Sequence, residues 1–190
     1  MSSRPSIVLA SASPRRRELL GNAGIDFVIH PANIPEEPFE GEAPIAFAER
    51  MAREKARVVF AQDRNRTILA ADTVVSLGPL ILGKPVDTED ATRMLELLSG
   101  RRHLVTTAVC LVANGFEDLR SETTAVDFAP LAPTDVRDYV ATGEPMDKAG
   151  AYAIQGLASR WITKIEGDYY NVVGLPVDLV WRMLRARNLL

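Results

Sequence analysis

Cysteine is almost absent from this chain of 190 residues, which contains only Cys110, inside the apolar run AVCLVA. One cysteine cannot form a disulfide within the chain, and a lone cysteine in an apolar run is typical of a small core residue. A chain that makes no use of disulfides indicates a reducing compartment. We therefore expect a cytoplasmic protein.

Long apolar runs are also missing. The N-terminal run, from Ile7 to Ala10, is too short for the core of a signal peptide. No stretch approaches the ~18 apolar residues that a membrane span needs. We expect neither an export signal nor a membrane partner.

The chain lacks an excess of positive charge and several well-known catalytic motifs. It has 22 Lys and Arg against 25 Asp and Glu, a net charge of -3. Proteins that hold a nucleic acid polymer by its backbone usually have a basic balance, so we expect no such partner. The absence of GxGxxG, GxxxxGK[ST], GxSxG and HExxH, with His30 and His103 far apart in the sequence, excludes the motif-defined serine and zinc hydrolases.

What is present is typical of one folded domain, residues 1–190, with 47% hydrophobic and 25% charged residues. Strands and helices are mixed with a hairpin signal at Asn114-Gly115, which predicts an α/β fold with a mixed sheet flanked by helices. Strands are expected at 6–11, 26–30, 67–77, 103–113, 116–129, 160–167 and 169–173, and a turn with a short strand within 78–85. Helices are expected at 14–24, 45–62, 88–100, 132–143 and 177–190. The 67–77 strand is expected to end or bend near Asp72, and Thr88 to cap its helix.

The segment SASPRRR, residues 11–17, places small residues and three arginines where a strand gives way to a helix. Ser13 can cap that helix, and Pro14 suits its first position. Arginines at a helix start oppose the helix dipole, so a bound anion would relieve the conflict, although solvated arginines are an equally simple interpretation. Adjacent helical residues are about 100° apart, so Arg15, Arg16 and Arg17 cannot all face one ligand.

Asp72 interrupts the apolar strand TILAADTVVSL. A buried carboxylate is costly unless it is paired, hydrogen-bonded or bound to a metal. Asp72 is therefore a candidate to bind Mg²⁺ or to act on a water molecule, and the alternative is a residue that caps a turn at the strand end.

Other candidates carry less information when taken singly. Lys55 and Lys84 could each be a solvated surface lysine, although Gly83 and Pro85 should hold Lys84 in a fixed turn. Glu36 and Glu37 lie in an acidic, proline-rich loop, as solvated charges or as a second carboxylate for a metal. The Gln155 amide offers a donor and an acceptor that suit the edge of a base, but from spacing alone it is a loop residue.

In their order along the chain, LASASPRRRELL, AREKA, ADTVV, GKP, LSGRRHLVTTAV, EPMDKAGAYAIQG and GDYYNVVGLP resemble the Maf family. The resemblance extends from about Leu9 to Pro176, and the SASPRR and DKAGAYAIQG segments are its most specific parts. It implies a fold like that of inosine triphosphate pyrophosphatases, with an elongated mixed sheet and two lobes around a cleft. It also implies hydrolysis of a nucleoside triphosphate to the monophosphate and pyrophosphate, a divalent metal such as Mg²⁺ or Mn²⁺, and a homodimer.

The resemblance also implies roles for individual residues. Asp72 matches the proposed catalytic base and metal ligand, and Glu36 matches an acidic position near the metal, with Glu37 as its possible replacement. The positions that match substrate-binding or specificity residues of the family are Ser11, Arg15, Arg16, Lys55, Thr73, Lys84 and Gln155. The DKAGAYAIQG segment resembles the branch that acts on dTTP and UTP. A glutamine amide can meet the N3–H and O4 of thymine or uracil, but a flipped amide could equally meet cytosine.

Two other function classes stay open at this stage. One is a nucleotide-binding regulator of cell division, which would bind a nucleotide without turning it over. The other is a nucleic-acid binder that uses SPRRR, against which the net charge and the lack of interleaved aromatic residues argue.

Overall fold

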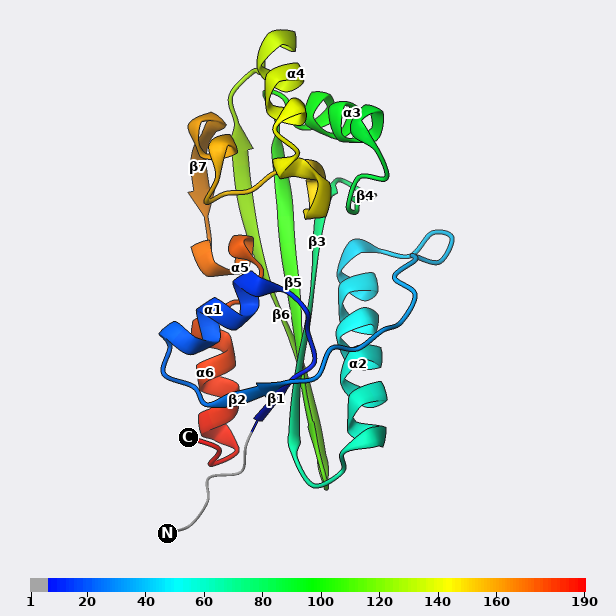
Figure 1. Cartoon of the computed structure of the whole chain (residues 1–190), viewed down its shortest axis with the longest axis vertical. Coiled ribbons are helices and arrows are strands. Elements are labelled where there is room, and N and C mark those ends of the chain that lie inside the picture. Colours follow the sequence, from blue (N-terminus) through cyan, green and yellow to red (C-terminus); the bar gives the residue numbers. More distant parts are fainter. Residues whose placement is uncertain (1–6) are drawn as a thin grey trace.

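The computed structural model describes residues 7–190, which form a seven-stranded sheet with helices on both faces (Figure 1). The strands are β1 (Ile7–Leu9), β2 (Phe27–Ile29), β3 (Thr67–Leu77), β4 (Leu80–Leu82), β5 (Arg102–Ala113), β6 (Phe116–Phe128) and β7 (Ile162–Glu166). The α-helices are α1 (Pro14–Asn22), α2 (Pro44–Gln62), α3 (Thr88–Leu98), α4 (Pro133–Ala141), α5 (Tyr169–Val173) and α6 (Val177–Ala186). Three short 3₁₀ helices complete the fold: η1 (Glu144–Asp147), η2 (Ala149–Ala151) and η3 (Leu157–Trp161).

The sheet is mixed, as the sequence predicts. Its order is β2-β1-β3-β5-β6-β7, and β4 also pairs with β3. β1 runs parallel to β2 and β3, and the other pairs are antiparallel. The expected hairpin is confirmed: Ala113 lies opposite Phe116, and Gly115 takes the positive φ that this tight turn needs.

The side chains of β3 alternate between two apolar cores, because successive residues of a strand point to opposite faces. Ala70 and Val74 pack on the face that α2 covers. Ala71 and Val75 pack on the other face, with α1, α3, α4 and α6. The same alternation places Asp72 on the α2 face and Thr73 on the opposite face.

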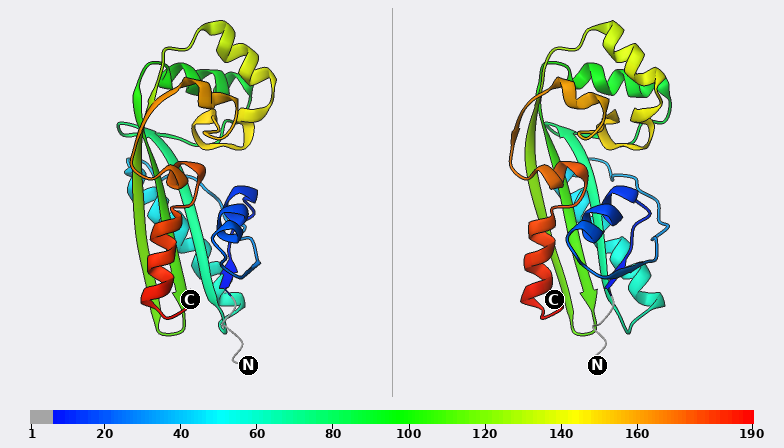
Figure 2. Two further views of the ribbon diagram at one scale, coloured as in Figure 1. Left: turned by 90° about the vertical axis from the view of Figure 1, so that its left-hand side faces the viewer. Right: turned by 60° about the vertical axis from the view of Figure 1, so that its left-hand side comes forward.

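Two groups of elements surround the ends of the long strands β3, β5 and β6 (Figure 2). α1, α2, α6, β1 and β2 lie around one end, and α3, α4, β4, η1 and η2 lie around the other (Figures 1 and 2). We call these groups the lower and the upper lobe, after Figure 1.

The edge of β3 is open between the two lobes. β1 pairs with β3 as far as Leu69, and β4 pairs with it from Val75 onward. Between these two residues no strand of the described chain pairs with this edge, whereas β5 pairs continuously with the opposite edge. A gap in the sheet therefore faces the interval between the lobes.

Three details of the predicted secondary structure are wrong. β3 neither ends nor bends at Asp72, because it stays paired with β5 there, with Asp72 opposite Ala108. Residues 169–173 form the helix α5 rather than a strand. The Asp168 carboxylate caps that helix by accepting from the backbone N–H groups of Tyr170 and Asn171.

The third error concerns the start of α3. Asp87, not Thr88, is its N-cap, and the Asp87 Oδ1 accepts from the Asp90 N–H at 2.8 Å. The first predicted strand is confirmed over Ile7–Leu9, and its first residue, Ser6, lies outside the described residues.

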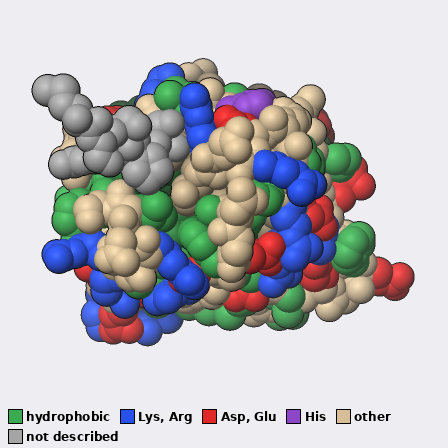
Figure 3. Space-filling model, turned by 90° about the horizontal axis from the view of Figure 1, so that it is seen from below, with side chains coloured by type: hydrophobic (Ala, Val, Ile, Leu, Met, Phe, Trp, Pro, Cys, Tyr) green, Lys and Arg blue, Asp and Glu red, His purple; other side chains and the backbone are tan. Residues whose placement is uncertain are grey.

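Cys110 is fully buried, as expected of a small core residue, and burial raises the pKa of its thiol to about 12. Within residues 7–190, no helix has both the length and the apolar character that crossing a membrane requires. Figure 3 shows the lower end of the molecule, where Lys and Arg side chains lie next to Asp and Glu side chains. Near the β5–β6 turn, Arg57 pairs with Glu117, and Arg120 pairs with Asp118.

Candidate active site

A cavity of about 350 Å³ lies at the gap in the sheet and is lined by both lobes. All nine site residues predicted from the sequence line it: Ser11, Arg15, Arg16, Glu36, Lys55, Asp72, Thr73, Lys84 and Gln155. Arg17 and Glu37 are not among the lining residues. The structure brings the predicted residues together, and the chemical role of each stays a prediction.

The start of α1 forms one wall of the cavity. Ser13 caps the helix, and its Oγ accepts from the Arg16 N–H at 3.4 Å. Pro14 occupies the first turn, where no intrahelical partner for a backbone N–H is lost. The predicted cap is thus confirmed, and the N-terminal end of the helix dipole faces the cavity.

The Arg16 side chain ties α1 to the rest of the site. Its Nε donates to the Gly174 carbonyl at 2.8 Å, and its Nη2 donates to Thr73 Oγ1 at 2.9 Å. Its Nη1 donates to Ser11 Oγ at 3.3 Å. Burial lowers the pKa of this guanidinium, and the charges of Asp72 and Glu36 oppose that shift. Arg16 therefore acts as a fixed cation at the cavity wall.

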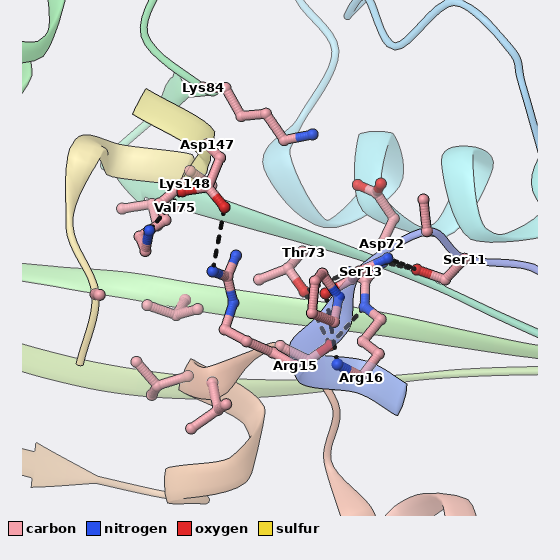
Figure 4. A pocket seen from close by; sticks show the side chains of 18 of the residues that line it. Ser11, Ser13, Arg15, Arg16, Asp72, Thr73, Val75, Lys84, Asp147 and Lys148 are labelled. Atoms are coloured by element: carbon pink, nitrogen blue, oxygen red, sulfur yellow. Dashed lines mark hydrogen bonds and ion pairs between the residues drawn. The ribbon is translucent and has the colours of Figure 1, made fainter. Parts of the chain in front are cut away.

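Arg15 takes a different position and reaches across the cavity. Its Nη1 lies 3.5 Å from Oδ2 of Asp147 in the upper lobe, and the two side chains point toward each other (Figure 4). The Asp147 side chain is 66% exposed, so this pair contributes little and can exchange its partner for an anion. Arg17 is exposed outside the cavity, as expected if three adjacent arginines cannot face one ligand.

A buried charged cluster forms the polar end of the cavity. The Lys55 Nζ lies 2.6 Å from Asp72 Oδ1 and 2.6 Å from Glu36 Oε1. Lys55 and Asp72 are each only 6% exposed, so the interpretation of Lys55 as a solvated surface lysine is wrong. Its position on the buried face of α2, opposite the Asp72 side of β3, explains the difference.

Glu36 is the partly exposed member of this cluster. Burial raises the pKa of its carboxyl, but the hydrogen bond and charge of Lys55 outweigh burial and hold the pKa below its ordinary value. Glu37 is not among the residues that line the cavity, and its backbone carbonyl accepts from Arg50 Nη2 at 2.9 Å. The structure therefore favours Glu36 over Glu37 as the acidic residue of the site.

The donor set of this cluster fits a divalent cation. The Asp72 and Glu36 oxygens contact one ammonium nitrogen and so lie within twice 2.6 Å of each other. Mg²⁺ is commonly bound by one or two carboxylates together with water and substrate phosphates. Within residues 7–190 no group of three or more His, Cys, Asp and Glu side chains could hold an ion. An ion at this position would therefore need oxygen ligands from the substrate or from water.

The other end of the cavity is mainly apolar and contains Gln155. Its lining includes Val75, Val105, Ile154 and Val173. Gln155 is exposed, and its amide makes no hydrogen bond to any other described residue. Neighbouring side chains therefore do not fix the orientation of the amide.

Glycine shapes the turn beside this apolar end. Gly150 has a φ of +70°, and a Cβ there would lie 2.9 Å from Val75 Cγ1. Its N–H donates to the Gly83 carbonyl at 3.0 Å. This contact fixes the turn that carries Lys84.

Sequence reasoning missed several residues of the site. Asp147 and Lys148 line the cavity and belong to the DKAGAYAIQG segment, whose adjacent opposite charges were the available signal. Gly174 also lines it, and its carbonyl accepts from Arg16. Gly174 lies in the GDYYNVVGLP segment of the family resemblance, which was the available signal for that position.

The chain was compared with a family model, with curated relatives and with solved structures. The family model described as "Maf-like protein" matches residues 6–187. The "dTTP/UTP pyrophosphatase" of Koribacter versatilis (strain Ellin345) is 51% identical over 184 residues, which cover 97% of this chain and 95% of that protein. The protein of the same name from Geobacter sulfurreducens is 50% identical over 181 residues, covering 94% and 95%. A solved structure, that of the Staphylococcus aureus Ham1 protein, is 12% identical, with a TM-score of 0.48 and coverage of 96% and 99%.

Proposed function

Because the chain belongs to the Maf family, we propose that it is a nucleoside triphosphate pyrophosphatase that hydrolyses dTTP and UTP to the monophosphate and pyrophosphate. The observation that carries this function is the cavity itself. It joins a helix start with two arginines to a buried carboxylate at the open edge of β3. Two relatives that share about half of the residues of this chain are named for the same activity.

The polarity of the cavity orients the nucleotide. Arg15, Lys84 and the first turn of α1 would bind the triphosphate, whose charge they offset. The base would then lie at the apolar end, where Gln155 can meet the N3–H and O4 of thymine or uracil.

Asp72 is proposed as the residue that acts at the α-phosphorus. Its carboxylate would orient a water molecule and accept its proton while the water oxygen bonds to phosphorus. The bond from the α-phosphorus to the bridging oxygen breaks, and pyrophosphate leaves with that oxygen. Lys55 holds the carboxylate in place, with its Nζ 2.6 Å from Asp72 Oδ1. Arg15 and Lys84 would stabilise the charge that develops on the leaving pyrophosphate.

Asp72 and Glu36 would also hold Mg²⁺ or Mn²⁺, which supplies further positive charge to the triphosphate. We also propose a cytoplasmic location, on the basis of the single buried cysteine, and a homodimer, on the basis of family membership.

The experiment that tests this function is a pyrophosphate-release screen over ordinary and modified nucleoside triphosphates with Mg²⁺, Mn²⁺ or Co²⁺. We expect release to be fastest with dTTP and UTP and to require the metal. Tight nucleotide binding without release would instead support a regulator of cell division. Salt-sensitive binding of an oligonucleotide without turnover would support the nucleic-acid alternative.

A further inference from the structure

Two side chains outside the cavity lining hold the turn that carries Gln155. The Tyr139 hydroxyl, from α4, donates to Glu144 Oε1 at 2.8 Å. The same hydroxyl accepts from the Ala153 N–H at 3.2 Å, and Glu144 Oε1 accepts from the Leu157 N–H at 3.0 Å. These contacts join α4 and η1 to the back of the turn.

The two backbone N–H groups held by Tyr139 and Glu144 lie at equal distances along the chain on either side of Gln155. Ala153 lies two residues before it, and Leu157 lies two residues after it. The Gly156 N–H also donates to the Ala153 carbonyl at 3.1 Å, which closes the turn. Gln155 is therefore at the tip of a turn whose two sides are both anchored, although its own amide makes no hydrogen bond to another residue within 7–190.

Gly156 makes room for the Glu144 carboxylate. A Cβ at residue 156 would lie 2.1 Å from Glu144 Oε1. The Gly156 backbone, with a φ of -102°, would accept any residue, so the space for the carboxylate is what requires glycine. An alanine there would push the carboxylate away from Leu157.

Tyr139 is suited to a fixed role in this arrangement. It is 1% exposed, and its ring packs edge-to-face on Trp161 with 5.1 Å between centroids. Burial, together with the hydrogen bond to Glu144, raises the pKa of the phenol, so the hydroxyl stays a donor.

We propose that Tyr139 and Glu144 are positioning residues that determine base selectivity by fixing the backbone on both sides of Gln155. This inference rests on the proposed function, because it assumes that Gln155 contacts the base. An unrestrained glutamine amide can present either order of donor and acceptor. Selectivity for thymine or uracil over cytosine then depends on where the backbone holds it, and such geometry must be kept to about 0.5 Å.

The experiment compares Glu144→Ala, Gly156→Ala, the double variant and Tyr139→Phe, with Ser159→Ala as the control on the same loop. Ser159 is exposed and its side chain makes no hydrogen bond to another described residue. Two quantities are measured: hydrogen exchange of the backbone amides of residues 153 and 157, and kcat and KM for dTTP and dCTP with pyrophosphate release as the readout.

We expect faster exchange at residue 157 in all variants that displace the carboxylate. The ratio of kcat/KM for dTTP to that for dCTP should fall roughly tenfold, mainly through KM, because hydrogen bonds to a charged group that hold the turn are lost. The double variant should be no worse than either single variant, since both remove the same contact. Tyr139→Phe should also speed exchange at residue 153, and Ser159→Ala should behave as the wild type.

Several outcomes overturn the proposal. Unchanged exchange means that the pair does not hold the turn, and faster exchange with unchanged selectivity means that the turn does not govern base choice. Additive losses in the double variant mean that the two substitutions act separately. If the wild type releases no pyrophosphate from dTTP or UTP, the proposed function fails first, and exchange alone then decides whether the pair holds the turn.

Discussion

At the polar end of the cavity, buried Lys55 contacts two carboxylates, and Arg16 makes three hydrogen bonds to its surroundings. At the apolar end, Gln155 is exposed and its side chain is unrestrained by other described residues. Contacts between side chains fix the polar end. At the apolar end, hydrogen bonds to the backbone of the turn that carries Gln155 fix the position of that turn.

This difference follows from the chemistry expected at each end. Charges beside a reacting phosphorus must be oriented before the substrate arrives, because reorganisation during the reaction is costly. A base is recognised by a few hydrogen bonds, so the position of one turn can decide it. The comparison predicts that variants at the polar end lose turnover, whereas variants at the apolar end lose selectivity.

The largest loss of turnover should come from Asp72→Asn. If this variant kept its turnover, the proposed difference between the two ends of the cavity would be wrong. We expect kcat to fall about 10³-fold, as is typical when a general base is removed. Lys55 keeps Glu36 as a partner, so the fold should survive. The measurement is pyrophosphate release from dTTP together with the thermal midpoint. Asp118→Asn, which removes a carboxylate paired with Arg120 away from the cavity, is the matched control.

A smaller loss of activity is expected at Arg15, and it should exceed the loss at its near neighbour Arg17. Arg15→Ala should weaken kcat/KM for dTTP by about tenfold, since one charged contact to phosphate is removed. Arg17→Ala should stay within about twofold, because Arg17 lies outside the cavity. Steady-state kinetics of both variants provide the test, and equal losses would contradict the geometry of the anion site.

The last prediction concerns stability and sharpens the comparison at the apolar end. Buried His103 contacts the hydroxyl of Tyr152, a cavity residue, at 2.8 Å. Burial lowers the pKa of His103 to about 4, although Asp127 opposes the shift. Between the ordinary pKa, about 6.5, and about 4, the unfolded chain binds a proton that the folded chain does not. Stability should therefore fall as pH falls through this range, by roughly 2 kcal/mol at pH 5.

Urea unfolding between pH 7 and pH 5 measures this loss. His103→Gln should reduce the pH dependence, and His30→Gln, at an exposed position, should leave it unchanged. An identical slope in His103→Gln and the wild type would show that His103 is not its source.

Local signals were sufficient for much of the fold. Ser13-Pro14 predicts the start of α1, and Asn114-Gly115 predicts the β5–β6 hairpin, because capping and turn geometry depend on adjacent residues. Asp72 was identified as unusual from its apolar neighbours, but its position in mid-strand depends on β5. Residues 169–173 have a strand-like composition, yet form α5, which Asp168 caps and a long-range contact holds against β5. There, buried Asn171 accepts from the Thr107 N–H at 3.1 Å.

The same limit applies to the site. Family resemblance supplied its residues, but spacing alone could not show that Lys55 is buried between Asp72 and Glu36. These contacts join α2, β3 and a loop, which only the folded chain brings together. Tyr139 lies in none of the segments that resemble the family, and Glu144 opens the EPMDKAGAYAIQG segment without any sign there of what it contacts. The importance of both side chains comes from the backbone groups they hold.

The interruption of the sheet beside Asp72 has a consequence for self-association. Unpaired strand edges invite pairing with another polypeptide, and proteins commonly guard them with inward-pointing charge. Here a short open edge lies between two paired segments, with the Asp72 carboxylate, paired with Lys55, at its centre. Replacing that carboxylate with an apolar side chain would remove the guard as well as the chemistry, so such a variant should aggregate more readily than Asp72→Asn.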